Sequence, residues 1–309
     1  MKNRLKNIPT PLAGLGLGLA GFASLTMNFN AKVGYVISFV ALVTLLMVLL
    51  KILLNFRIFP DELKHPVLGS IIPTFTMGIM ILSNFVSKFH FTFGKVLWIT
   101  AVIIHAVLLI VFLLNFIKNF NFLNIIPSYF IPPVGIVVAC VSGKIFNMPE
   151  LCNVIFYLGF VSYLILLPVV LIRLKKGELP KPKKPTMAIL AAPASLCLAA
   201  YFTMGNLEQN ALLYILVPLS VIMTLFVYYK LINLIRKPFN PGFSAFTFPL
   251  VISAVAMFKY AGYLSKSGIE FAQYVKIFGF VQYWIAAAVI AYVSIKYFQL
   301  IFLRSKKIA

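Results

Sequence analysis

Residues 127–143 read PSYFIPPVGIVVACVSG, an uncharged, mostly apolar run that is interrupted by Pro133. Such a run is typical of a helix that crosses a bilayer, because a hydrocarbon core of about 30 Å needs roughly 20 apolar residues. A proline inside a helix removes one backbone hydrogen bond and bends the axis. The stretch therefore predicts a bent transmembrane helix over residues 125–143.

The proline recurs along the chain at an almost fixed distance. Pro73, Pro133 and Pro193 are spaced by 60 residues, and Pro249 follows after 56. Counting back 60 residues from Pro73 leads to the glycine-rich stretch beside Gly14. A fixed period implies a repeated structural unit. We predict that this unit is one helical hairpin, used five times.

Ten apolar runs without acidic residues cover most of the chain. They are residues 9–29, 33–54, 67–87, 96–117, 125–143, 151–172, 186–204, 211–229, 243–264 and 277–295. In lipid the backbone must satisfy its own hydrogen bonds, so single runs of this length predict helices. We therefore predict an all-α integral membrane protein, in which residues 1–309 form a single transmembrane domain of ten helices.

The prolines divide these helices into two groups. Four odd-numbered runs carry the repeated prolines, whereas Pro168 and Pro218 are the exceptions among the even runs. Backbone groups freed by a proline are tolerated in a membrane where they face protein or a water-filled cavity. We expect an inner ring of five kinked odd helices around a pore, surrounded by an outer ring of five even helices.

Composition and charge agree with a lipid-embedded protein. Hydrophobic residues make up 62% of the chain and charged residues 11%, and the formal net charge is +21. The basic residues lie between apolar runs, and twenty of the 27 fall on one side if the helices alternate in direction. Because basic residues mark the cytoplasmic side, we predict an inner-membrane protein with both termini in the cytoplasm and no nucleic-acid partner.

The polar residues favour passive transport over catalysis. All six acidic residues fall in loops or at helix ends, whereas cation-coupled carriers commonly hold the ion with intramembrane carboxylates or histidine. Coupling through protonation of the substrate stays open as an alternative. His105 lacks a second ligand at helical spacing and is expected to bond a neighbouring helix. No metal, cofactor or enzyme activity is predicted.

Lys259 is the one cation well inside an odd run. An intramembrane charge suggests a functional role, and here it would attract anions towards the outer mouth. The alternative is that the side chain extends to the membrane interface or pairs with Glu270. The sequence favours neither interpretation.

Small and aromatic residues in the odd runs are candidates for shaping a pore. Gly14, Gly18 and Gly21 share one face of the first run, where they permit close helix approach, leave room for an ion, or do both. Phe246 and Phe248 precede Pro249. A bulky ring beside a kink can close a narrow lumen, although most phenylalanines pack against lipid or other helices.

Four segments together resemble the tellurite-resistance/dicarboxylate transporter family, the TehA-like proteins that include the plant guard-cell slow anion channels. The segments are TPLAGLGLGLAGF at 10–22, PSYFIPPVGIVVA at 127–139, LAAPASLCLAAYF at 190–202 and FSAFTFPLVISAVAMFKYA at 243–261. The resemblance implies five helical hairpins, an inner five-helix pore and a homotrimer with one pore in each protomer. It also implies transport of small inorganic or organic anions.

The resemblance assigns roles to particular residues. It implies that Phe248 occludes the pore and that Gly14 keeps the lumen open, while Lys259 in FKYA looks closer to the plant members. The candidate pore-shaping residues are Gly14, Gly18, Pro73, Pro133, Pro193, Phe246 and Pro249. The two functional hypotheses are a passive anion channel and a secondary carrier, proton-coupled or gradient-driven, for sulfite, tellurite or C4-dicarboxylates such as malate.

Overall fold

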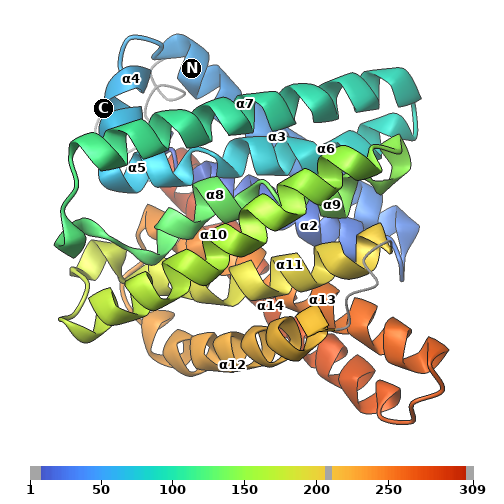
Figure 1. The fold of residues 1–309 in the computed structure, drawn as a ribbon. Coiled ribbons are helices and arrows are strands. Elements are labelled where there is room, and N and C mark those ends of the chain that lie inside the picture. The colour runs from blue at the N-terminus through green and yellow to red at the C-terminus, as the bar shows by residue number, and fades with distance from the viewer. Residues whose placement is uncertain (1–7, 206–210, 304–309) are drawn as a thin grey trace.

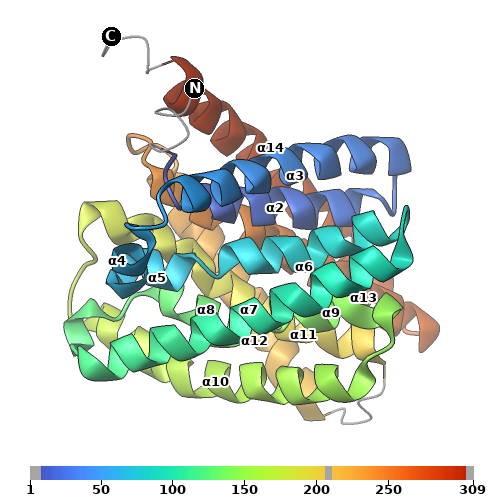
Figure 2. The same ribbon diagram turned by 90° about the horizontal axis from the view of Figure 1, so that it is seen from above.

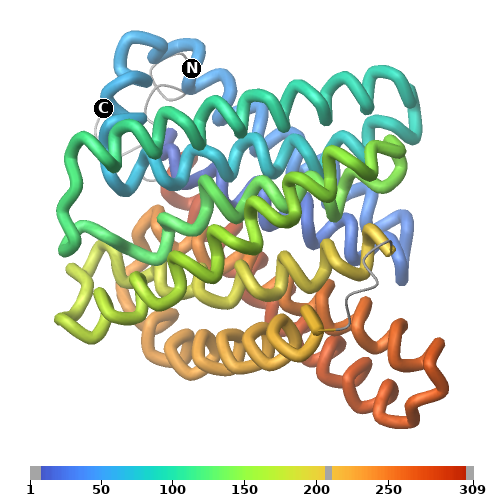
Figure 3. Tube along the Cα trace, in the orientation of Figure 1, coloured from blue at the N-terminus to red at the C-terminus, as the bar shows by residue number. Residues whose placement is uncertain are grey.

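The computed structural model describes residues 8–205 and 211–303, and within these ranges every regular element is helical. The long helices run side by side in one bundle (Figure 1). Successive helices are joined at alternate ends of this bundle, as the tube in Figure 3 shows. Successive long helices are therefore antiparallel, and their grouping into five hairpins stays a prediction.

The even-numbered predicted spans form long helices. They are α3 (Ala31–Leu54), α7 (Phe91–Lys118), α10 (Pro149–Lys175), α12 (Ala211–Leu234) and α14 (Ala272–Phe298), the last continuing into the π-helix η6 (Gln299–Leu303). Asn30 and His90 cap α3 and α7 because their side chains accept hydrogen bonds from backbone N–H groups in the first turn. The first four of these spans are α-helical throughout, and α14 changes to a π-helix only at its end.

The odd-numbered spans are broken. They comprise α2 (Leu12–Thr26), α5 (Pro66–Ile71) with α6 (Thr74–Ser87), η2 (Pro127–Phe130) and α8 (Ile131–Gly135) with α9 (Val138–Ser142) and η3 (Gly143–Phe146), η4 (Lys181–Ala191) with α11 (Ala192–Met204), and η5 (Pro241–Phe246) with α13 (Thr247–Lys266). Each repeated proline caps an α-helical part or lies in its first turn. Proline is tolerated there because those N–H groups have no partner within the helix.

Burial separates the two sets of helices. The most apolar stretch is 67% buried in span 66–87, 83% buried in span 181–204 and 72% buried in span 241–266. In the five even spans it is only 28–33% buried. Fourteen of the fifteen residues of α2 are also buried. The view from above shows α3, α7 and α10 along the outside of the bundle (Figure 2). The helices that carry the repeated prolines and glycines therefore lie inside.

The number of predicted spans is matched in part. Among the described residues, eight helices are long and apolar enough to cross a membrane, and a ninth is added if Pro127–Gly135 and Val138–Phe146, bent by 51°, count as one span. The remaining predicted span, 9–29, contains α2, which has 15 residues and is shorter than a usual spanning helix. The arrangement of ten helices stays a prediction.

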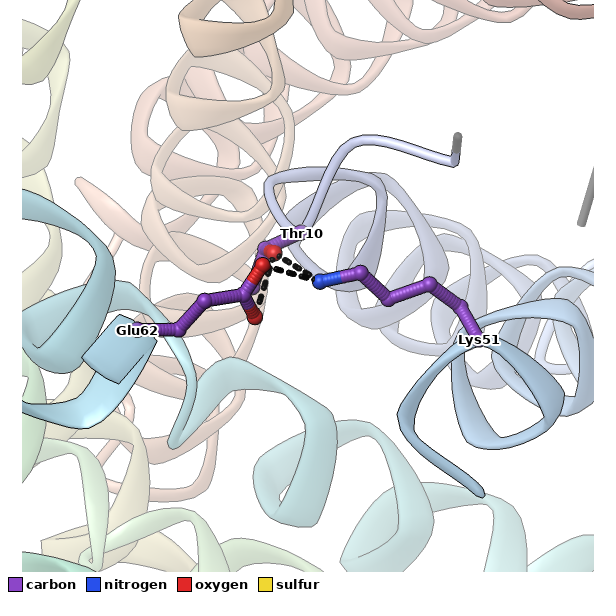
Figure 4. A network of polar contacts seen from close by, with 3 residues as sticks. All are labelled: Thr10, Lys51 and Glu62. Carbon is purple, nitrogen blue, oxygen red and sulfur yellow. Dashed lines mark hydrogen bonds and ion pairs between the residues drawn. The ribbon is translucent and has the colours of Figure 1, made fainter. Parts of the chain in front are cut away.

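A buried polar network fixes one end of the bundle. Lys51, 5% exposed in the last turn of α3, forms an ion pair with Glu62 of the short helix α4 (Phe59–Lys64). Lys51 Nζ also donates to Thr10 Oγ1 at 2.7 Å, and Thr10 Oγ1 donates to the second oxygen of Glu62 at 3.0 Å (Figure 4). The three groups join α3 and α4 to the residues that precede α2.

One further short element, the connecting helix η1 (Phe122–Asn124), lies between α7 and η2.

Candidate functional site

Phe248 lies between two cavities inside the bundle. Its side chain is 5% exposed and borders both an inner cavity, towards η5, and an outer cavity, towards Lys259. Leu196 of α11 is the other described residue that borders both cavities. Two apolar side chains, from α13 and α11, therefore stand at the boundary between the cavities.

The inner cavity is small and almost wholly apolar. All five odd segments contribute to its wall, which consists of Gly14, Leu17, Ile71, Thr74, Met77, Phe130, Ile131, Val134, Gly135, Ile189, Ala192, Pro193, Leu196, Ser244, Ala245, Phe248 and Pro249. Its volume is about 50 Å³, enough for a few water molecules. The cavity wall carries two hydroxyl groups, those of Thr74 and Ser244. The Thr74 hydroxyl is already engaged, because its Oγ1 donates to Ile71 O at 2.8 Å.

The outer cavity is larger and more polar. It has a volume of about 210 Å³ and is again lined by all five odd segments: Gly21, Ser24, Leu25, Asn28, Ile81, Asn84, Val138, Val141, Ser142, Leu196, Phe248, Val251, Ile252, Val255 and Lys259. Phe248, Ile252, Val255 and Lys259 follow one face of α13 at helical spacing. The cavity therefore continues for about three helical turns, from Phe248 to a cation.

The glycines of α2 divide into two roles. Gly14 lines the inner cavity, where an added Cβ would lie 3.0 Å from Ser244 Oγ. Gly21 lines the outer cavity, and a Cβ there would lie 3.4 Å from the Phe248 ring. Gly18 borders neither cavity, because its face meets Thr247 so closely that a Cβ would overlap that side chain. Gly18 therefore serves the close approach of α2 and α13.

The remaining candidates differ in position. Pro193 and Pro249 line the inner cavity, whereas Pro73 and Pro133 lie next to the lining residues Thr74 and Val134. Phe246 borders neither cavity; it is 1% exposed and packs edge-on against Phe243, with 5.4 Å between ring centroids. Phe246 is the last residue of the 3₁₀ helix η5, whereas Phe248 lies in the first turn of α13, and of the two only Phe248 borders the cavities.

Lys259 lies at the outer end of the outer cavity. The three ion pairs of the described residues are Lys51–Glu62, Lys64–Asp61 and Lys184–Glu178. The pairing with Glu270 considered from the sequence is not among them.

Comparison with known proteins identifies the family. The model of the SLAC1 family, described as voltage-dependent anion channels, matches residues 7–298. The chain belongs to the SLAC1 family. This confirms the resemblance drawn from the four segments, because a TehA homologue is among the relatives described next.

Two curated relatives of this SLAC1-family protein are described as transporters and a third as a tellurite resistance protein. An uncharacterized transporter of Methanocaldococcus jannaschii is 28% identical over 264 residues, covering 74% of each chain. A second one from that organism is 28% identical over 222 residues, covering 61% of this chain and 62% of its own. A tellurite resistance protein TehA homolog of Haemophilus influenzae is 28% identical over 129 residues, covering 41% of this chain and 39% of its own. Family membership and the apolar helices support a multi-pass membrane protein with a role in anion transport.

His105 of the SLAC1-family chain joins helices, as its lone position predicted. Its Nε2–H donates to Pro132 O at 2.9 Å, and its Nδ1 lies 2.8 Å from Thr76 Oγ1. The ring, fully buried on α7, therefore bridges α6 and α8. Among the residues described, no group of three His, Cys, Asp or Glu side chains is placed to hold a metal ion.

Several lining residues of this SLAC1-family protein were missed from the sequence, chiefly Ser24, Asn84 and Leu196. Ser24 and Asn84 each lie eleven residues after the repeat positions Ala13 and Pro73. Eleven residues are about three turns of helix, so both return to the face of the repeat position. A search for polar residues eleven positions after each repeat position would have found Ser24 and Asn84.

Proposed function

We propose that the protein is a channel-like permease that lets small anions cross the cytoplasmic (inner) membrane down their electrochemical gradient. The observation that carries the proposal is the position of Phe248 between two cavities walled by the same five segments. In this proposal the Phe248 ring closes the route at rest, with Leu196 opposite it. A rotamer change or a small helix movement opens it, as in hydrophobic gates.

The proposed architecture is a single transmembrane domain of ten helices, with the odd helices inside. For α2 to be the first span, its backbone must continue beyond 15 residues. Hydrogen-bonded turns flank it at both ends, so that residues 10–29 are helix or turn, and these 20 residues at the helical rise would reach about 30 Å. Gly14, Pro193 and Pro249 would shape the inner lumen, and Pro73 and Pro133 would turn their neighbours towards it.

Electrostatics supports anions as the transported species. The lining of the two cavities, as far as described, contains no carboxylate, and Lys259 is its one ionisable side chain. A cation at the outer end would raise the local concentration of anions, while passage requires that each binding step stays weak. Cations would meet an uncompensated positive charge.

Assembly and orientation follow from the family resemblance and from charge. We expect a homotrimer with a separate route in each protomer, embedded in lipid through the exposed faces of the even helices. Both termini would face the cytoplasm, on the side of the Lys51–Glu62 network. The inner cavity would then open towards the cytoplasm when Phe248 moves.

A planar-bilayer recording of the purified protein tests the proposal against a secondary carrier of sulfite, tellurite or malate. A channel gives unitary anion currents that follow the anion gradient, and Phe248→Ala should raise them several-fold. A carrier gives saturating flux that responds to an imposed pH gradient and shows no unitary steps. Carrier behaviour in both the wild type and Phe248→Ala would replace the channel mechanism.

A further inference from the structure

Four buried hydroxyl groups gather where α11, α12 and α13 meet. Ser195 lies on α11 and Ser253 on α13, while Ser220 and Thr224, four residues apart, share one face of α12. Each is at most 1% exposed, and none borders the inner or the outer cavity. The cluster therefore lies behind the cavity wall, and it includes an even helix none of whose described residues line either cavity.

The hydroxyl groups of α12 contact both neighbouring helices. Ser220 Oγ lies 2.8 Å from Ser195 Oγ of α11, and Thr224 Oγ1 donates to Ser253 Oγ of α13 at 3.0 Å. Pro218, one of the two prolines in the even runs, lies two residues before Ser220, where its missing N–H makes α12 easier to bend. Because buried hydroxyl groups are costly without partners, these bonds constrain how α11 and α13 sit beside α12.

The serines of α11 and α13 also bond the backbone beside the repeated prolines. Ser195 Oγ donates to Ala191 O at 2.7 Å, next to the turn that contains Pro193. Ser253 Oγ donates to Pro249 O at 2.8 Å. A serine that bonds the carbonyl oxygen four residues earlier often bends its helix. The hydroxyl groups therefore act on the turns of α11 and α13 that already carry a proline.

Those turns carry the two side chains at the boundary between the cavities. Leu196 follows Ser195 directly along α11. Phe248 precedes Pro249, whose carbonyl oxygen accepts the bond from Ser253. A change in either hydroxyl bond would alter the backbone that carries Leu196 or Phe248.

The cluster has fewer protons than contacts. Five contacts of 2.7–3.2 Å join the four hydroxyl groups to one another and to the two carbonyl oxygens. A hydroxyl group carries one proton and can accept two hydrogen bonds. While Ser195 and Ser253 donate to the carbonyl oxygens, their own contact at 3.2 Å lacks a proton. Rotation of one hydroxyl group would move this gap, so the cluster has more than one bonded arrangement.

We propose that Ser220 and Thr224 of α12 are positioning residues for the barrier between the cavities. Through the serines of α11 and α13, they hold the turns that carry Leu196 and Phe248 in the closed arrangement. A helix whose most apolar stretch is only 28% buried thereby sets the closed state without contacting the ion. The proposal rests on the proposed function, because positioning the barrier affects transport only if Phe248 closes the route.

Chloride flux into liposomes tests this role with both barrier residues left intact. Ser220→Ala combined with Thr224→Val removes the two α12 hydroxyl groups and should raise flux several-fold, while each single variant should raise it less. Thr224→Ser keeps a hydroxyl group and should conduct as the wild type does. Thr203→Val is the matched control, because its buried hydroxyl group borders neither cavity and donates to Ala199 O of its own helix at 2.7 Å.

Fluorine NMR separates the cluster from the transport route. 4-Fluorophenylalanine in place of Phe248 reports the surroundings of the ring without any ion flow. Its resonance should shift or split in the variant that lacks both α12 hydroxyl groups and stay unchanged in Thr203→Val. A changed resonance together with no flux in Phe248→Ala would support the positioning role and reject the proposed function.

The opposite result rejects the positioning role and keeps the function. It consists of an unchanged resonance and wild-type flux in the Ser220 and Thr224 variants, while Phe248→Ala conducts. Gel filtration and melting temperature confirm that each variant is folded, and the single variants decide the question if the double variant does not fold.

Discussion

Phe248 of α13 and Leu196 of α11 stand together at the boundary between the inner and outer cavities. Both are nearly buried, at 5% and 2% exposure. In the proposed route, an ion that passes from one cavity to the other would have to move between these apolar side chains or displace them. The proposed barrier would therefore be shared between two helices, although the sequence pointed to the aromatic residue alone.

Leu196→Ala should raise anion current in the wild-type background, by a smaller factor than Phe248→Ala. The smaller side chain widens the boundary, while the phenyl ring remains. Planar-bilayer recording measures the effect, and Leu198→Ala, fully buried on the same helix but outside both cavities, is the control. In the proposed route these two residues share one barrier, so their effects should not add in the double variant. Equal currents in the Leu196 and Leu198 variants would remove Leu196 from the barrier.

Alanine at the two glycines should have different effects. Gly18→Ala forces Thr247 to move, and Thr247 Oγ1 is bonded to Gly14 O at 3.0 Å and Ser244 O at 2.7 Å. We expect a loss of about 1–3 kcal/mol of stability, seen as a lower melting temperature in detergent. Gly14→Ala places a methyl group 3.0 Å from Ser244 Oγ in the wall of the inner cavity, so it should destabilise the protein less than Gly18→Ala and should reduce the current of Phe248→Ala. The reverse pattern would contradict the roles assigned here.

The Lys51–Glu62–Thr10 network should contribute strongly to stability. Glu62→Gln leaves the buried Lys51 ammonium without its counter-charge, which we expect to cost about 3 kcal/mol. The double variant Lys51→Met/Glu62→Leu should recover most of that loss. The matched control is Lys64→Met, whose exposed pair with Asp61 at 3.8 Å should contribute less than about 1 kcal/mol. Thermal unfolding in detergent measures all three, and equal shifts for Glu62→Gln and Lys64→Met would refute the network.

His105→Phe should destabilise the bundle without altering anion selectivity. The substitution removes the bond to Pro132 O and the contact with Thr76, and leaving a buried carbonyl unpaired costs about 1–3 kcal/mol. His105 borders neither cavity, so the current carried by each folded protomer should persist. A variant with the wild-type melting temperature would show that the bridge is dispensable.

The sequence predicted the division of the helices better than their ends. The 60-residue proline period marked the segments that are now buried, because bent helices find partners for their freed backbone groups inside protein. Helix boundaries were placed too late where a charge interrupted an apolar run. The prediction began spans at 96 and 277, after Lys95 and Lys276, whereas α7 begins at Phe91 and α14 at Ala272.

The site was less predictable, because side-chain direction depends on local twist and on neighbouring helices. Phe248 was selected through family resemblance, and Phe246, named with it as a candidate pore-shaping residue, borders neither cavity. Asn84 carries no signal by itself, since an amide near a helix end is usually solvated. Its place beside Lys259 arises from α6 and α13 meeting the same cavity, a relationship between segments about 170 residues apart.

A side-chain series at position 248 tests the central claim most directly. Chloride flux should be measured in liposomes for the wild type and for the Leu, Ala and Gly variants at 248, with Phe246→Ala as a control of similar burial. The account predicts that flux rises as the side chain at 248 shrinks and that Phe246→Ala stays at the wild-type level. Equal flux across the series, in protein that is folded and inserted, would contradict the claim that the Phe248 ring closes the route.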